Sequence, residues 1–206
     1  MEQKENDVAT KRRGRPRAYD RETALRRATD AFWRTGYSGT SFDEIAVAAG
    51  MNRPSLRAAF GDKHALYLIA LNAYWADKFA TMHDALREGT LDAALMRAYD
   101  AALALYFAGE GSTRSCFVVG TALTEAVEDP EIRRIVTAGL ATLDAAFEAR
   151  FRLARETGEL REDADPVALA ILASATMHSI AVRARAGASR DALRTLARQA
   201  VHVICG

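Results

Sequence analysis

Apolar residues recur every three or four positions along most of the chain, the spacing that gathers them on one face of an α-helix. Leu25, Ala28 and Phe32 form such a stripe within residues 20–36, which predicts a first helix that begins at an aspartate cap and ends at a glycine. A second stripe within residues 41–50 predicts a second helix, again closed by a glycine. Neither stretch alternates strictly between apolar and polar residues, as a half-buried strand would.

The shortest predicted helix runs from Asn52 to Phe60 and has about two turns. Leu56 and Phe60 lie on one side of it and must pack onto the two preceding helices, because a helix this short is unstable alone. The other side carries Arg53 and Arg57, which directs it outward. A helix about 10–12 Å wide fits the major groove of B-form DNA, which is about 12 Å across.

Longer helices are predicted over the rest of the chain. The one that begins at Lys63 has apolar residues on more than one face, as expected of a connector that touches two partners. Half of the residues are apolar and only four are proline, which also favours helices over sheet. We therefore expect an all-α fold of about nine helices. The last six are expected at residues 63–88, 91–108, 117–127, 130–158, 166–186 and 190 to near the C-terminus.

The net charge of +1 conceals an uneven distribution. Residues 1–60 hold twelve Lys and Arg against eight Asp and Glu, whereas residues 61–206 hold sixteen against nineteen. The segment Lys11–Arg17, KRRGRPR, contains five cations and no acid. Such a block is either a disordered solubilising tail or an arm that binds a polyanion such as nucleic acid.

The cysteines and the apolar segments bear on the cellular compartment. Cys116 and Cys205 are too few to form a disulfide framework, which fits a reducing cytoplasm. The first residues lack the apolar core of a signal peptide, so no export is expected. The longest uncharged stretch, Pro166–Val182, is short for a bilayer span and contains hydroxyl and imidazole groups. We expect it to form a buried helix, and we expect no membrane partner.

A motif of several parts links the first four predicted helices. The sequence ETALRRATDAFWRTGYSGTSFDEIAVAAGMNRPSLRAAFGDKHALYLIALNAY, residues 22–74, carries the frame GY..TS...IA..AG......L...F..K..L. Over this length it resembles the amino-terminal domain of the TetR family of transcriptional regulators. The helices over residues 42–49 and 53–60 then form a helix-turn-helix, whose second helix enters the major groove. From spacing alone, three small packed helices with a solvated face are the alternative.

The resemblance implies which residues contact DNA. Lys63, Thr40 and Ser41 match positions that contact phosphates in the family. Arg57 stands where the family has a tyrosine, so we expect either an ionic phosphate contact or a bidentate pairing with a guanine edge. The implied contacts on the short third helix are Arg53, Pro54, Ser55 and Arg57.

The basic arm offers a second mode of DNA binding. RGRPR, residues 13–17, resembles the core of an AT-hook. Arg13, Arg15 and Arg17 would then lie along an A·T-rich minor groove, where the potential is most negative. A loose phosphate-binding arm is the alternative, and both roles make affinity fall as salt rises.

The remaining two-thirds of the chain resembles the carboxy-terminal half of the same family in its helix count. The resemblance implies a homodimer formed through the last two helices, and a small-molecule effector held among the middle helices. The ninth helix agrees, because Leu193, Ala197 and Val201 fall on one stripe, although a monomeric core is the alternative. Few charges lie among the large side chains, so an apolar or aromatic effector is expected. The candidate lining residues are Trp75, Phe79, Met82, Tyr99, Tyr106, Phe117, Phe147 and Met177.

No cofactor, metal or catalytic constellation is expected. The four histidines show no metal-ligand spacing, and the chain has neither a phosphate loop nor a nucleophile elbow. Cys116 is either a redox or electrophile sensor activated by Arg114, or an inert buried thiol.

These observations predict a DNA-binding transcriptional regulator, a repressor released from a near-palindromic operator by its effector. The expected domains are a flexible basic arm at residues 1–19, a helix-turn-helix domain at 20–64, and an effector-binding and dimerisation domain at 65–206. A helical carrier protein with a basic tail and no sequence-specific DNA binding is the alternative from another class. An enzyme built on a helical bundle would need catalytic residues that the sequence does not offer.

Overall fold

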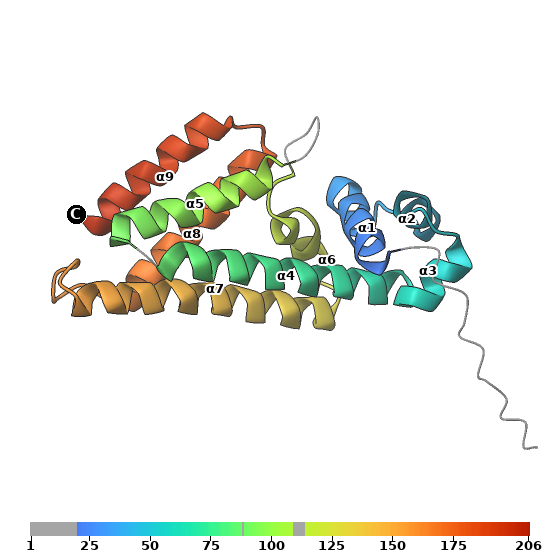
Figure 1. Cartoon of the computed structure of the whole chain (residues 1–206), viewed down its shortest axis with the longest axis horizontal. Helices are drawn as coiled ribbons and strands as arrows, with labels where there is room; N and C mark the ends of the chain where they lie inside the picture. Colours follow the sequence, from blue (N-terminus) through green and yellow to red (C-terminus); the bar gives the residue numbers. More distant parts are fainter. Residues whose placement is uncertain (1–19, 88, 109–113) are drawn as a thin grey trace, which may run out of the picture.

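The computed structural model describes residues 20–87, 89–108 and 114–206. Within these ranges the chain forms nine α-helices, one short π-helix and no strands, which confirms the predicted all-α class. Helices α1–α3 lie at one end of the molecule and the C-terminus lies at the other (Figure 1). The α-helices are α1 (Arg21–Thr35), α2 (Phe42–Ala49), α3 (Arg53–Phe60), α4 (Lys63–Arg87), α5 (Leu91–Tyr106), α6 (Leu123–Glu125), α7 (Pro130–Glu156), α8 (Pro166–Arg185) and α9 (Arg190–Cys205).

The N-terminal domain, α1–α3, starts and stops its helices where the sequence predicts. Asp20 caps α1, and its carboxylate accepts hydrogen bonds from two first-turn N–H groups. Ser41 and Glu44 form a reciprocal capping box at the start of α2. Gly50 then closes α2 with a φ of 68°, a left-handed conformation that glycine adopts without strain.

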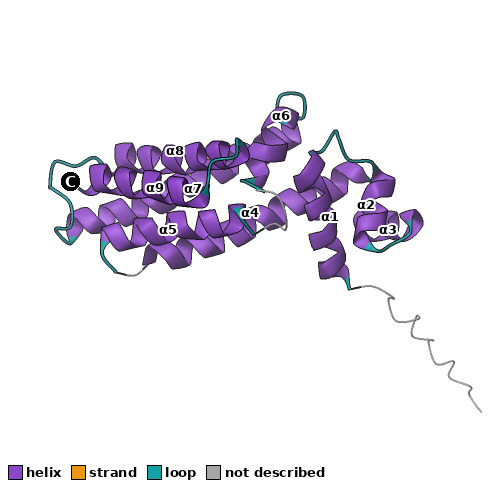
Figure 2. Cartoon of the chain, turned by 90° about the horizontal axis from the view of Figure 1, so that it is seen from above, coloured by secondary structure: helices purple, strands orange, loops and turns teal. Residues whose placement is uncertain are grey.

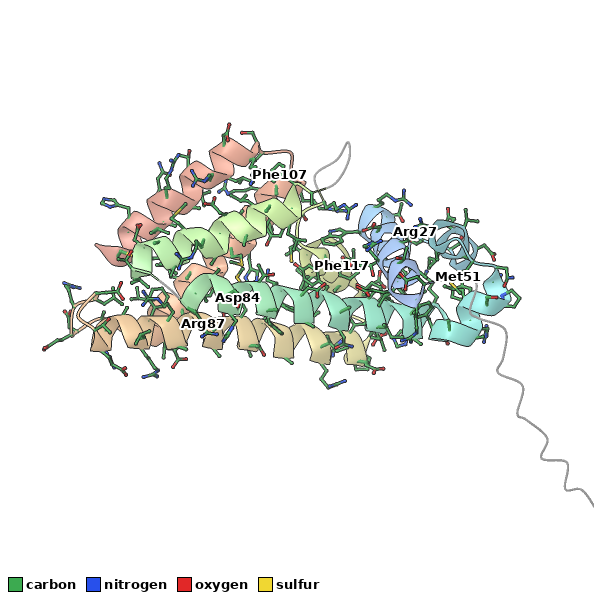
Figure 3. The ribbon with its side chains drawn as sticks, viewed as in Figure 1. Arg27, Met51, Asp84, Arg87, Phe107 and Phe117 are labelled. Atoms are coloured by element: carbon green, nitrogen blue, oxygen red, sulfur yellow. The ribbon has the colours of Figure 1, made fainter. Side chains whose placement is uncertain are left out.

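Helix α4 joins the N-terminal domain to the rest of the chain. It begins beside α3, packs on α1, and continues without a break to Asp84 and Arg87 at its far end (Figure 3). His64 Nε2 lies 2.7 Å from Asp129 Oδ2, which ties the base of α4 to the first turn of α7. The expected domain division after residue 64 therefore falls inside one continuous helix.

The second part of the molecule is a bundle of α4, α5, α7, α8 and α9. Helix α7 packs along α8, and α5 packs along α4 and α9. Helices α4 and α7 approach closely at Gly139, where an added Cβ would overlap the indole carbons of Trp75. The missing side chain at Gly139 thus makes room for a tryptophan that is only 4% exposed.

The sixth predicted helix differs from the expectation. Residues Val118–Ala122 form a π-helix, and only Leu123–Glu125 continues as α-helix. Thr121 Oγ1 donates a hydrogen bond to the carbonyl of Phe117 at 2.8 Å and shares another with the hydroxyl of Tyr67 at 2.8 Å. This side-chain bond competes with the regular α-helical ladder, as hydroxyl groups inside helices commonly do.

Helix α8 contains the stretch that was expected to be a buried helix. By length and composition it could span a membrane, with a mean hydropathy of 1.5 over 18 residues, but core helices meet the same criteria. It packs on α7 and α9, and 39% of that window is buried inside the chain. Its other side lies along the edge of the molecule opposite α5 (Figure 2). That side exposes Val167, Ile171, Leu172 and Val182.

The apolar stripe of α9 is used within the chain. Leu193, Ala197 and Val201 are each at most 2% exposed, because α9 packs on α5 and α8. The expectation that this stripe faces a second copy is therefore corrected. Of the two last helices, α8 supplies most of the exposed apolar surface, and Val203 is the large exposed apolar residue on α9.

Candidate nucleic-acid interface and effector pocket

Helix α3 is held against the protein by two apolar anchors. Leu56 is fully buried and Phe60 is 4% exposed, so the helix presents its opposite side to solvent. Asn52 Oδ1 accepts a hydrogen bond from the N–H of Ser55 at 2.8 Å, which fixes the first turn. Pro54 lies in that turn, where a missing N–H costs nothing, and it is exposed.

Two arginines project from the exposed side of α3. No described residue lies within hydrogen-bond or ion-pair distance of the Arg57 guanidinium, and Arg57 is exposed. Arg53 Nη1 donates to both carboxylate oxygens of Asp43, at 3.1 and 3.0 Å, and its guanidinium lies 5.8 Å from the ring centroid of Phe42. The side chains of this ion pair are 58% and 67% exposed, so the pair contributes at most about 1 kcal/mol. Arg53 can therefore exchange its carboxylate for a phosphate or a base at little cost.

The residues expected to contact phosphates differ in exposure. Ser41 is exposed at the start of α2, and Lys63 begins α4 with its Nζ 4.3 Å from the ring centroid of Tyr37. Thr40 is only 3% exposed. Its hydroxyl donates to a backbone carbonyl at 2.6 Å and shares a hydrogen bond with Thr35 at 2.5 Å. The expected phosphate contact of the Thr40 side chain is therefore corrected to a structural role in the turn before α2.

Sequence reasoning missed two acidic residues on this surface. Asp43 holds Arg53, as described above. The N–H of Ser41 holds the pKa of Glu44 below its ordinary value, so Glu44 is anionic at neutral pH. Both negative charges would repel a phosphate placed beside them. The arm residues Arg13, Arg15 and Arg17 lie outside the described residues.

A pocket of about 440 Å³, here the α1 pocket, lies between α1, α4 and α5. Its apolar walls include Leu25, Trp33 and Met82, of which Met82 was a predicted lining residue. The indole Nε1 of Trp33 donates to the carbonyl of Arg114 at 2.9 Å. Arg114 Nη1 in turn lies 2.7 Å from Asp30 Oδ1, so the chain at Arg114 is held against α1. The α1 pocket is therefore bounded by a helix of the N-terminal domain.

A second pocket of about 360 Å³, here the α8 pocket, lies between α4, the π-helix, α7 and α8. Trp75, another predicted lining residue, forms part of its wall. Ile171 and Val182 also line it, so this pocket opens near the exposed apolar side of α8. Burial lowers the pKa of His178 in the same wall, and the nearby Lys78 lowers it further.

Most of the other predicted lining residues belong to the core. Phe117 lies between α1 and α4 (Figure 3), where its ring packs 5.3 Å from that of Trp33. Phe79 stacks on Trp75 with ring centroids 5.1 Å apart. Large side chains at helical spacing thus mark tight packing here and do not mark a cavity. The predicted residues that are fully buried and line neither pocket are Tyr99, Tyr106, Phe117, Phe147 and Met177.

Lys78 on α4 lines both pockets, and sequence reasoning missed it. It is 6% exposed, no described carboxylate lies within ion-pair distance, and burial lowers the pKa of its amine. Its Nζ lies 6.0 Å from the ring centroids of both Tyr74 and Tyr106. The Tyr74 hydroxyl lies 3.1 Å from Cys116 Sγ, so the thiol is buried within the same cluster. A lysine within the apolar stripe of α4 was the signal that could have revealed this site.

Helix α3 is cationic, faces outward and packs on two other helices, and the continuous helix α4 joins this unit to a larger helical bundle. This arrangement defines a helix-turn-helix DNA-binding regulator. The sequence model of the bacterial regulatory proteins of the tetR family matches residues 24–69. The model of the tetracyclin repressor-like C-terminal domain matches residues 93–200. The chain belongs to the TetR family.

Individual relatives agree with this assignment. The chain is 30% identical to the HTH-type transcriptional repressor ComR of Escherichia coli (strain K12), over 91% of this chain and 90% of ComR. It is 28% identical to the uncharacterized HTH-type transcriptional regulator YezE of Bacillus subtilis (strain 168), over 88% and 94% of the two chains. A cysteine mutant of the TetR family regulator CifR, complexed with 26-bp double-strand operator DNA, matches with a TM-score of 0.83 and 30% identity, over 92% of this chain and 98% of that chain.

The chain is thus a DNA-binding transcriptional regulator and not an enzyme. This result confirms the predicted class. It also sets aside the alternative of a carrier protein without sequence-specific DNA binding.

Proposed function

We propose that the protein is a cytoplasmic repressor that binds a near-palindromic operator as a homodimer and releases it when a small molecule occupies the α1 pocket. The observation that carries this proposal is the exposed side of α3, which presents Arg53 and Arg57 while Leu56 and Phe60 hold the helix in place. Two relatives support the role: ComR is named a repressor, and the CifR structure contains operator DNA.

In the proposed complex α3 enters the major groove. Arg57, which has no partner among the described residues, pairs with a guanine edge, an interaction that discriminates between bases by about 1–3 kcal/mol. Arg53 leaves Asp43 and binds a phosphate. Ser41 and Lys63 contact phosphates on either side of the groove. The remaining proposed contacts are Pro54 and Ser55 on α3, and Arg13, Arg15 and Arg17 of the arm in the adjacent minor groove.

The proposed dimer uses the exposed side of α8. Val167, Ile171, Leu172 and Val182 are between 43% and 56% exposed, although all are large apolar residues on one helix. An apolar surface of this kind is typical of an interface between subunits. A two-fold axis beside α8 would place one α3 on each side of it, and the two must meet successive major grooves about 34–36 Å apart.

The α1 pocket connects effector binding to DNA binding. Helix α1 packs on α2, and α4 begins beside α3, so both walls of the pocket belong to elements that position the recognition helix α3. A molecule that binds one arrangement of α1 and α4 more tightly than another shifts the population toward it. DNA is released if the favoured arrangement gives the two α3 helices the wrong spacing.

Gel-shift titration of the purified protein against overlapping fragments of DNA upstream of its gene tests the proposal. We expect one fragment to be retarded at low salt in the presence of excess random DNA, with two protomers per site by native mass spectrometry. Random DNA of the same length and base composition is the control. Failure to retard any upstream fragment more strongly than the random DNA would show that the proposed operator role is wrong.

A further inference from the structure

We propose that Lys78 anchors a small organic carboxylate, carried on an apolar body, in the α1 pocket. The inference rests on the proposed function, because it names the chemical class of the effector. It replaces the expected apolar or aromatic effector with an amphipathic anion.

Among the described residues, none supplies a compensating charge to the ammonium group of Lys78. It is 6% exposed, and no described carboxylate lies within 4.0 Å of it. The rings of Tyr74 and Tyr106, at 6.0 Å, give weak cation–π attraction but accept no conventional hydrogen bond from its three N–H donors. A buried cation without a counter-ion is strongly unfavourable, so the side chain is poised to gain from an anion.

No described neighbour accepts a hydrogen bond from the ammonium group of Lys78. Trp75 Nε1 is buried and has no hydrogen-bond partner among the described residues, and the same is true of the Tyr106 hydroxyl. The Tyr74 hydroxyl is already engaged with the Cys116 sulfur at 3.1 Å. The group that this part of the core lacks is therefore an acceptor, and the charge that it lacks is negative.

The other charged residues of the α1 pocket do not meet this need. Asp30 is paired with Arg114 at 2.7 Å. Glu22, Arg26 and Asp77 are exposed, so water screens them at the rim of the pocket. Lys78 is thus the buried charge among the residues that line the pocket.

The remaining walls favour a hydrocarbon skeleton. Leu25 and Trp33 come from α1, Met82 from α4, and Leu105 from α5. A volume of about 440 Å³ lies within the range of small-molecule sites. A carboxylate that binds Lys78 therefore places its apolar body between α1 and α4, where it contacts α1 of the N-terminal, DNA-binding domain.

Matched probes that differ only in charge test the inference. We would measure the thermal shift of the DNA-free full-length protein with benzoate against benzamide and with octanoate against octanamide. We expect at least one carboxylate to stabilise the protein with an affinity at least about tenfold greater than its amide, as a hydrogen bond to a charged group would give. Equal effects of acid and amide, or no shift with either carboxylate, would overturn the inference.

Three variants test whether Lys78 causes the preference for a carboxylate over its amide. Lys78→Met and Lys78→Gln should each reduce the affinity for the carboxylate at least about tenfold and leave the amide unaffected. Met82→Leu alters the same pocket one turn further along α4 without changing charge, and it should keep the preference. Carboxylate binding that persists in both Lys78 variants would refute the assignment.

Gel shifts separate this inference from the proposed function. If the protein binds its operator but is released equally well by neutral compounds in wild type and Lys78→Met, the inference fails and the repressor role stands. If carboxylates bind through Lys78 but no upstream fragment is retarded, the anion site stands and the proposed operator role fails.

Discussion

Arg53 donates two hydrogen bonds from Nη1 to the carboxylate of Asp43, at 3.1 and 3.0 Å, and so α2 supplies a carboxylate that competes with phosphate for an arginine of the recognition helix α3. Asp43→Asn keeps the shape of the residue and removes the negative charge. We expect the operator affinity of Asp43→Asn to rise a few-fold, because Arg53 is released and one repulsion is lost, an effect of about 0.5–1 kcal/mol. Fluorescence anisotropy with labelled operator measures it, and weaker binding would show that Asp43 itself contacts DNA.

Arg57 is expected to read sequence. Arg57→Ala should cost about 1–3 kcal/mol of operator affinity and reduce discrimination at one base pair, while random-DNA affinity changes little. Arg87→Ala removes the same charge at the far end of α4 (Figure 3) and is the control. Competition binding against single-base operator variants measures the discrimination at each base pair. If Arg57→Ala instead weakens operator and random DNA equally and lowers the salt slope, Arg57 binds a phosphate.

Gly139→Ala should destabilise the protein, although alanine is the better helix former. The gain in helix propensity is about 1 kcal/mol, but the new Cβ overlaps the Trp75 indole, and overpacking costs typically about 1–3 kcal/mol. We expect a lower midpoint of urea unfolding and a changed tryptophan fluorescence. Ala138→Ser, on the exposed side of the same helix, should be nearly neutral. A stabilised Gly139→Ala protein would contradict the close packing of α4 on α7.

Lys78→Met should stabilise the ligand-free protein by about 1–3 kcal/mol at pH 8, because it removes a buried polar group that has no carboxylate partner in the described part of the chain. Burial lowers the pKa of Lys78 from its ordinary 10.5, so the unfolded chain binds more protons than the native state between the two pKa values. The native state of the wild type therefore recovers stability as the pH rises toward 10.

The difference in free energy of unfolding between Lys78→Met and wild type should accordingly decrease from pH 8 to pH 10. His178, the other titratable group with a lowered pKa beside Lys78, is neutral throughout this range. Urea unfolding at each pH measures this difference, with Met82→Leu as the control that should show no such trend. A destabilised Lys78→Met protein would mean that the lysine has a structural counter-ion in the folded chain.

The exposed side of α8 should govern the oligomeric state. Ile171→Asp places a charge at the centre of the proposed interface and should convert a dimer to a monomer at micromolar concentration. Val203→Asp changes an equally apolar residue that is 74% exposed on α9, and it should leave the dimer intact. Light scattering coupled to gel filtration distinguishes the two, and the opposite pattern would place the interface on α9.

Local sequence signals predicted where the helices begin. Asp20, Ser41 and Asn52 cap α1, α2 and α3 at the first residues of the three predicted segments, and α7 and α8 begin at the predicted residues 130 and 166. A cap satisfies N–H groups within three residues of itself, so its effect is decided by the chain nearby. For the same reason the sequence predicted that Arg57 faces outward, because Leu56 and Phe60 occupy the other side of a helix of two turns.

Local sequence signals could not predict which distant elements contact each other. The stripe of α9 was visible in the sequence, but only the packing of α5 decided that the chain covers it internally and leaves α8 exposed. Thr40 is buried because α1 and α2 close around it, and Lys78 is buried because α5 and Cys116 pack against α4. Helical periodicity tells which residues share a face; which faces meet depends on the sum of many weak packing contacts across the whole fold.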